Sequence, residues 1–97
     1  MTTIKKKQFI CPACGFPELT EDPMEQTYEI CPSCGMEFGY ADAQYHATGD
    51  VGVYRNWREQ WIRGGMKWVH KDKDSLEEKP KDWNPKEQLK NIPEEYR

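Results

Sequence analysis

Four cysteines carry the clearest chemistry in this chain. They lie in two pentapeptides, CPACG at residues 11–15 and CPSCG at residues 31–35. The C-x2-C…C-x2-C pattern is typical of a site in which four thiolates hold one metal ion. A glycine follows each second cysteine and accepts positive φ without steric cost, so each turn can close tightly on the ion. We predict that the metal ligands are Cys11, Cys14, Cys31 and Cys34.

The residue types favour zinc over iron but do not exclude iron. Tetrahedral sulfur ligation suits both metals. The short interval between the two cysteine pairs is typical of a zinc site. Iron in the same cage would give an electron carrier resembling rubredoxin, whose turns also read Cys-Pro-x-Cys-Gly. Four protein ligands leave no position for water or substrate, so we expect a structural site and no enzymatic activity.

Two other uses of the cysteines are disfavoured. Two disulfides in a secreted miniprotein would call for a signal peptide, and residues 1–7 contain no apolar run. A redox Cys-x-x-Cys motif belongs on a helix within a βαβ unit, which two paired turns do not resemble. Thiolates committed to a metal indicate a reducing compartment, and we therefore expect a cytoplasmic protein.

Composition indicates one small domain spanning residues 1–97. Hydrophobic residues make up 36% of the chain and charged residues 32%, so the apolar core must be small. A bound metal would add its binding energy to folding. The net charge of −3 gives no general attraction to nucleic acid. No segment approaches the apolar length that crosses a membrane, so we expect no membrane partner.

The elements around the cysteines predict a small α+β, metal-stapled domain with a zinc ribbon over residues 8–40. Short antiparallel strands are expected at residues 8–10 and 28–30, and residues 15–19 should pair back on the first turn as a hairpin. Residues 36–40 alternate apolar and polar side chains and predict a third ribbon strand, with Met36, Phe38 and Tyr40 on one face. Glu37 is interpreted as the solvent side of this strand and Asp42 as a turn or capping residue.

A packing helix is predicted over residues 50–65. Asp50 is a candidate N-cap, and Gly64-Gly65 should end the helix in left-handed conformation. Apolar side chains recur at helical spacing on one face, namely Val53, Tyr54, Trp57, Trp61 and Ile62. We expect this face to pack on the ribbon face of Met36, Phe38 and Tyr40, although the two tryptophans could instead form an interface with a ligand or partner.

A second candidate site is the locally basic stretch around this helix. Arg55, Arg58, Arg63 and Lys67 could contact phosphate or an acidic partner. The alternative is that they form a solvated helix face. His46 and His70 are not expected to bind the metal, because four cysteines already complete the site.

The C-terminal part contains a charged linker or loop at residues 71–81 and a short helix at residues 84–92. Asn84 is a predicted N-cap, Pro85 suits the first helical position, and Glu87 would complete a capping box. Leu89 and Ile92 should face inward. Trp83 is expected to dock this segment, because so short a helix is marginal alone.

With these motifs in view, the chain resembles the bacterial zinc-ribbon proteins grouped as the cysteine-rich CPCC family. The resemblance covers ICP at residues 10–12, CGF at 14–16 and YEICPSC at 28–34, with similar tails at residues 57–65 and 83–89. It departs where the family has a third cysteine and this chain has Ala13. The resemblance implies a zinc-ribbon fold in a bacterial or phage protein, and it implies no activity.

Four functions compete. We favour a zinc-stapled module acting through protein contacts, similar to immunity, antitoxin or adaptor proteins, because no nucleophile and base accompany the closed site. The first alternative is a zinc-ribbon protein that binds nucleic acid through the basic stretch. The second is the iron-containing electron carrier. An enzyme is the least favoured, because a closed site does not activate water.

Overall fold

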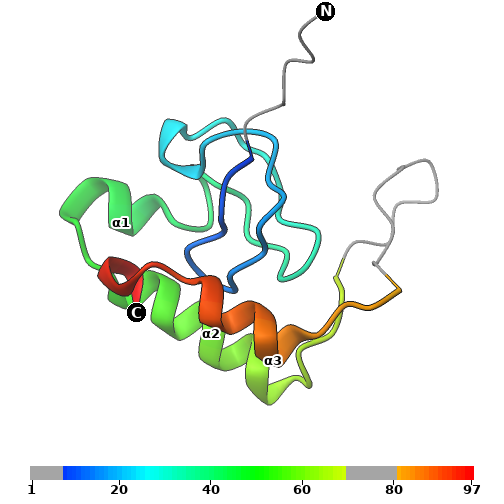
Figure 1. Cartoon of the computed structure of the whole chain (residues 1–97). Helices are drawn as coiled ribbons and strands as arrows, with labels where there is room; N and C mark the ends of the chain where they lie inside the picture. Colours follow the sequence, from blue (N-terminus) through cyan, green and yellow to red (C-terminus); the bar gives the residue numbers. More distant parts are fainter. Residues whose placement is uncertain (1–7, 70–80) are drawn as a thin grey trace, which may run out of the picture.

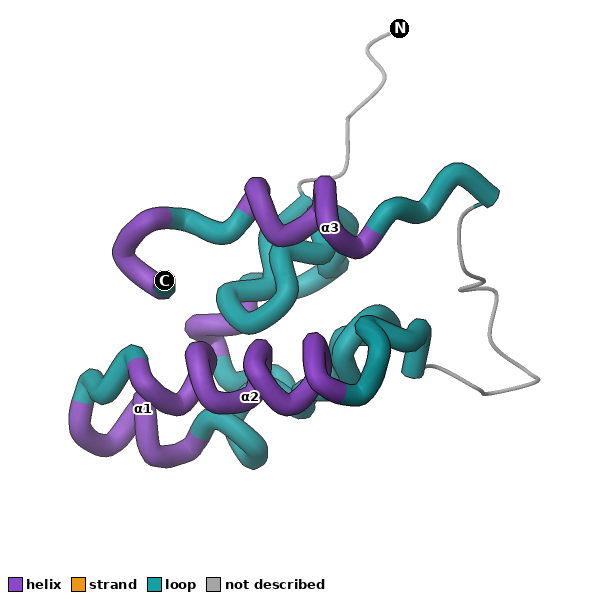
Figure 2. Tube along the Cα trace, turned by 90° about the horizontal axis from the view of Figure 1, so that it is seen from below, coloured by secondary structure: helices purple, strands orange, loops and turns teal. Residues whose placement is uncertain are grey.

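The computed structural model describes residues 8–69 and 81–97. The predicted linker at residues 71–81 lies outside the described residues except for Lys81, as does His70. Figure 1 shows the cysteine-bearing loops lying over helix α2, with the C-terminal segment passing in front of α2 in this view. Figure 2 shows the same arrangement from below, with the loops reaching both α2 and the C-terminal segment. The described helices are, in order, η1 (Pro23–Glu25), α1 (Ala43–Thr48), α2 (Gly52–Arg63), α3 (Pro85–Gln88), η2 (Leu89–Asn91) and η3 (Glu94–Tyr96).

The predicted ribbon strands do not form within the described residues. Each cysteine turn is flanked by one isolated antiparallel bridge, Phe9 with Leu19 and Ile30 with Glu37. The paired segments beside the second cysteine turn are short because the backbone leaves the extended conformation close to the bridge. Tyr28 has φ 66° and Gly39 has φ 105°, and neither value is compatible with a continuing strand.

The predicted third strand at residues 36–40 is therefore wrong, and so is its apolar face. Met36 and Phe38 are fully buried, but the side chain of Tyr40 is 74% exposed. The chain turns after residue 37, and the backbone N–H groups of Tyr40 and Ala41 both donate to the Glu37 carbonyl. This turn leads directly into α1, so Tyr40 faces solvent rather than α2.

Helix α2 supplies the principal packing face, as predicted, with its first turn set by Asp50. The Asp50 carboxylate accepts a hydrogen bond from the Gly52 N–H at 2.9 Å, although Val51 occupies the position before the helix. Tyr54 and Trp61 are buried, whereas Ile62 is 40% exposed and does not join the core. Gly65 takes the left-handed conformation expected at the helix end, but Gly64, with φ −78°, does not.

The C-terminal segment begins with the predicted cap. The Asn84 side chain accepts hydrogen bonds from the N–H groups of Lys86 and Glu87, and Pro85 is the first residue of α3. Glu87 does not complete a capping box, because its carboxylate lies 3.1 Å from the Lys90 ammonium. After one turn the α-helix tightens into η2, and Ile92 is buried beyond it.

Aromatic contacts fix this segment to the body of the protein. The Trp83 ring packs edge-on against Trp68 at 5.3 Å and at a tilt against Trp61 at 6.3 Å. Phe16, next to the first cysteine pair, packs on Trp68 at 5.6 Å. The predicted docking role of Trp83 is thereby confirmed. None of the helices in the described residues is both long and apolar enough to cross a membrane.

Candidate metal centre

The four cysteines form one buried cluster with the geometry of a single cation site. Their Sγ atoms all lie within 4.8 Å of one another. The Sγ atoms of Cys11 and Cys34 are 3.8 Å apart, and those of Cys14 and Cys31 are 3.6 Å apart. A tetrahedron with metal–sulfur bonds of about 2.3 Å has sulfur–sulfur edges of about 3.8 Å. The spacing therefore fits one tetrahedral ion, and all four thiols are free of disulfide bonds.

Two similar turns hold these sulfurs, and we call residues 11–16 the first cysteine turn and residues 31–36 the second. In the first turn the Gly15 N–H donates to the Cys11 carbonyl at 2.9 Å. In the second turn the Gly35 N–H donates to the Cys31 carbonyl at 2.8 Å. The two glycines have φ of 86° and 81°, a conformation that disfavours any side chain. The sequence motif thus sets both turns locally.

Helix α2 binds the backbone carbonyls of the second turn through its two central tryptophans. The Trp57 indole N–H donates to the Cys34 carbonyl at 3.1 Å. The Trp61 indole N–H, one helical turn later, donates to the Ser33 carbonyl at 3.1 Å and to Lys67 at 2.9 Å. The Trp57 and Trp61 face therefore belongs to the core, and it packs on the cysteine turn rather than on a strand.

The same helix binds the first turn through Arg58. Its Nε donates to the Ala13 carbonyl at 2.7 Å, and its Nη2 donates to the carbonyls of Pro12 at 3.0 Å and Tyr96 at 2.7 Å. This side chain places a positive charge beside the sulfur cluster and joins the first turn to the C-terminal segment. Burial lowers the Arg58 pKa and so does Arg55, whereas the Cys11 and Cys14 thiols act in the opposite direction.

A buried glutamine, which sequence reasoning missed, connects both turns. Gln88 Nε2 donates to the Cys14 carbonyl at 3.3 Å and to Ser33 Oγ at 2.9 Å. Its Oε1 accepts from the Trp83 indole at 2.7 Å. Asn91 adds a hydrogen bond from its amide to the Gly15 carbonyl at 3.2 Å. A polar residue in a short helix carries no sequence signal for such a role, because the contacts join positions far apart in the chain.

The electrostatics of the cluster are those of thiols gathered away from water. Burial raises the pKa of Cys11, and its neighbouring cysteines add to the rise. Burial also raises the pKa of Cys31, where Cys14 and Cys34 add to the rise and Cys11 opposes it. For Cys14 burial acts in the same direction, but hydrogen bonds from Cys11 and the other cysteines outweigh it and lower the pKa. A divalent cation would favour ionisation of all four.

The basic stretch does not form one free cationic patch. Arg58 is occupied as described, and Arg55 Nη2 donates to the Arg97 carbonyl at 2.7 Å. Arg63 and Lys67 remain exposed. The interpretation of these four residues as a solvated helix face was thus incomplete, because Arg55 and Arg58 bind backbone carbonyls of the C-terminal segment.

A second buried cluster surrounds Asp42, which was interpreted as a turn or capping residue. Its side chain is fully buried and accepts hydrogen bonds from the Tyr54 hydroxyl at 2.8 Å and the Gly39 N–H at 2.6 Å. His46 Nε2 lies 2.9 Å from Asp42 Oδ2, the carboxylate oxygen that also accepts from Tyr54. His46 is therefore a partner of Asp42 and contributes nothing to the cysteine cluster.

Two Bacillus subtilis (strain 168) proteins are similar to this chain. Uncharacterized protein YoaQ is 30% identical over 78 residues, which cover 67% of this chain and 66% of that protein. Uncharacterized protein YozI is 29% identical over 75 residues, covering 63% and 62%. The chain thus matches slightly less than two thirds of each relative. No protein-family model and no solved structure matches it. The similarity to these two proteins supplies no function for the cysteine cluster.

Proposed function

We propose that this protein is a small module stapled by one structural zinc ion, and that it acts by contact with another protein. The observation that supports the zinc site best is the buried tetrad, whose closest sulfur pairs are 3.6 and 3.8 Å apart. Cys11, Cys14, Cys31 and Cys34 would fill all four positions of a tetrahedral ion. Such an ion stabilises the fold and has no free position for substrate.

The architecture also supports a structural role for the metal. The described residues contain two isolated bridges in place of a sheet, and the helices other than α2 are at most six residues long. Short elements of this kind are marginal without an additional cross-link. A single ion joining the two cysteine turns would supply that cross-link, since metal binding energy becomes folding energy.

Elemental analysis of the purified protein tests the metal. We expect about one zinc per chain, a colourless protein and loss of the native circular dichroism spectrum on chelation. A red protein with one iron per chain would instead support the electron carrier. A full-length protein that keeps its native spectrum after complete metal removal would contradict a structural ion.

The contact role is supported by apolar side chains left exposed on the cysteine-bearing loops. Ile10 and Ile30, which precede the two turns, are 39% and 50% exposed, and Tyr28 and Tyr40 are 61% and 74% exposed. Exposed aliphatic and aromatic residues on loops suit a protein interface of the immunity, antitoxin or adaptor kind. The occupied Arg55 and Arg58 leave nucleic-acid binding without a specific supporting observation.

Affinity capture tests this role. The zinc-loaded protein is used as bait in a bacterial lysate beside an Ile30→Glu, Tyr40→Glu variant, which changes only exposed side chains. We expect a partner that is retained by the wild type and lost by the variant. Recovery of the same proteins by both baits would contradict contact through these loops.

A further inference from the structure

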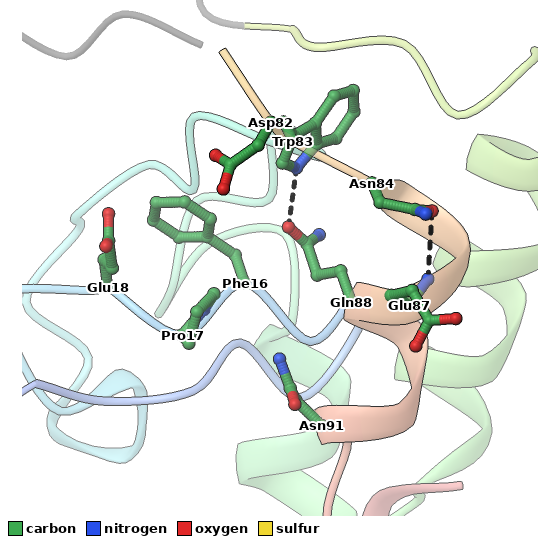
Figure 3. Close-up of a pocket in the computed structure, with 9 residues that line it drawn as sticks. All are labelled: Phe16, Pro17, Glu18, Asp82, Trp83, Asn84, Glu87, Gln88 and Asn91. Atoms are coloured by element: carbon green, nitrogen blue, oxygen red, sulfur yellow. Dashed lines mark hydrogen bonds between the residues drawn. The ribbon is translucent and has the colours of Figure 1, made fainter. Parts of the chain in front are cut away.

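A pocket of about 420 Å³ lies where the C-terminal segment meets the chain after the first cysteine turn. Phe16 and Pro17 form one wall, and residues 82–84 together with α3 form the other (Figure 3). Gln88 lies at its base and is held by Cys14, Ser33 and Trp83. Hydrogen bonds from Gln88 therefore connect the pocket to both cysteine turns.

The charge around this pocket has one sign. Glu18, Asp82 and Glu87 line it, and no lysine, arginine or histidine does so among the described residues. Glu87 is paired with Lys90, but Glu18 and Asp82 form no ion pair within the described part of the chain. In the view of Figure 3 the Phe16 ring lies between the carboxylates of Glu18 and Asp82. A pocket that combines an apolar lining with two carboxylates outside any ion pair of the described residues is complementary to a cation with an apolar stem.

We propose that this pocket binds a lysine or arginine side chain presented by a partner protein. The alkyl stem would pack on Phe16 and Pro17, and the charged group would pair with Glu18 and Asp82. An arginine would gain further from its planar group, which can bond a carboxylate with two N–H groups. This inference rests on the proposed contact function and assigns the chemistry of the partner.

The test uses the full-length, zinc-loaded protein and a defined probe. The probe is the peptide acetyl-Gly-Arg-Gly-Lys-Gly-amide, and acetyl-Gly-Gln-Gly-Gln-Gly-amide is its neutral control. Binding is followed by ¹⁵N–¹H NMR, with the Trp83 indole and the Asn84 and Asn91 amides as reporters in the pocket. We expect the basic peptide to shift these signals in a salt-sensitive manner and the neutral peptide to leave them unchanged.

Two double variants with equal charge change complete the design. Glu18→Gln with Asp82→Asn should weaken peptide binding about tenfold, because two attractive charge contacts are lost. Glu25→Gln with Glu59→Gln removes two exposed carboxylates elsewhere and should change the affinity less than about twofold, through long-range charge alone. Both variants should keep the wild-type spectrum and zinc content.

If both double variants weakened peptide binding equally, or if the NMR shifts were confined to other parts of the molecule, the proposed binding at this pocket would be wrong. If the pocket variant still retained the partner captured by the wild type, this inference would be wrong while the contact function stood. Failure of the contact function has a separate signature, namely that no partner is lost with Ile30→Glu, Tyr40→Glu. Peptide binding at the pocket can be measured in either case.

Discussion

The two cysteine turns are nearly alike in themselves and differ in what covers them. Both place a left-handed glycine after the second cysteine, and both close with the same backbone hydrogen bonds. The second turn is covered by neutral indole N–H groups from α2 and by the Val69 N–H, which donates to the Pro32 carbonyl at 3.1 Å. The first turn is covered by the charged Arg58 and by amides of the C-terminal segment.

This difference separates what the motif dictates from what the fold adds. A Cys-Pro-x-Cys-Gly sequence encodes its own turn, so the two sites look equivalent in sequence. The second turn is covered by the α2 tryptophans and Val69, whereas the first is covered by Arg58 of α2 together with amides of the C-terminal segment. We therefore expect the turns to respond equally when the shared ion is lost and unequally when their covers are changed.

The largest effect should come from removing one sulfur ligand, and it should be the same for both turns. Cys14→Ser and Cys31→Ser each leave three thiolates, and a structural zinc site contributes about 10–16 kcal/mol in small zinc peptides. That value is comparable with the whole stability of a domain. We expect both variants to lose the native circular dichroism spectrum at neutral pH.

Elemental analysis and thermal melting of the two variants provide the check. Ala13→Ser, which changes a buried non-ligand of the first turn, serves as the control and should retain zinc. If one cysteine variant kept full zinc content and wild-type melting, a single ion shared between the turns would be ruled out.

Matched glycine substitutions should separate the turns. An alanine at either position has unfavourable positive φ, which costs about 1–2 kcal/mol. At Gly35 the three nearest atoms to the new Cβ all belong to the Val69 side chain, with Cγ1 at 2.9 Å, so a shift of this side chain relieves the contact. At Gly15 it would overlap the Gln88 backbone carbonyl and crowd Ile92. We expect Gly35→Ala to lose about 1–2 kcal/mol and Gly15→Ala about 3 kcal/mol or more.

Denaturant unfolding at fixed free zinc measures this difference, because ligand concentration shifts the apparent stability. The Trp83 environment should change in Gly15→Ala and stay native in Gly35→Ala. Equal losses of stability in the two variants would show that the C-terminal segment does not press on the first turn.

Removing a side-chain donor to each turn should also lower stability unequally, by a smaller amount at each turn than the glycine substitution there. Arg58→Met keeps an unbranched stem but leaves the carbonyls of Pro12, Ala13 and Tyr96 without their donor, so we expect a loss of about 2–3 kcal/mol. Trp57→Phe removes one donor, to the Cys34 carbonyl, and should cost about 1 kcal/mol. The free energy of unfolding is the measurement, with the exposed Glu59→Gln as control. A larger loss of unfolding free energy for Trp57→Phe than for Arg58→Met would show that the indole donor, and not the arginine, contributes more to holding its turn.

The sequence was sufficient where structure is local. The cysteine turns, α2 and the Asn84 cap each depend on residues within a few positions, and the structure contains all three. It was insufficient where alternation and a turn compete in the same segment. The alternation at residues 36–40 indicated a strand, but a local turn with Gly39 at positive φ leaves Tyr40 in solvent.

Polar residues inside the core were the hardest to predict. Asp42 and Gln88 are buried because each finds partners from other elements, namely Tyr54 for Asp42, and Cys14 and Ser33 for Gln88. Buried polar groups are tolerated only when their hydrogen bonds are satisfied, and those partners are not adjacent in sequence. For the same reason the role of Arg58 could not be distinguished from that of an exposed helix arginine.

The smallest effect at neutral pH is expected where the C-terminal segment meets the helices that follow the second turn. The Tyr96 ring packs on Tyr45 at 6.0 Å and on Tyr54 at 5.7 Å. Burial raises the pKa of Tyr96 to about 12, and the neighbouring Tyr45 adds to the rise. The folded protein thus favours the protonated phenol. This contribution is complete below the unfolded pKa of about 10 and is lost as pH rises from there to about 12.

Tyr96→Phe should therefore change stability by no more than about 0.5 kcal/mol at pH 7, where the phenol is protonated in both states. Above pH 10 the wild type should lose stability more steeply than the variant, because only the wild type has this phenol to ionise on unfolding. Melting temperatures across this pH range measure the two slopes, and the exposed Tyr40→Phe is the control that should follow the wild type. Parallel slopes for wild type and Tyr96→Phe would mean that the chain end is not packed on the tyrosine rings. The first turn would then be covered by Arg58 and Gln88 without help from the last residues.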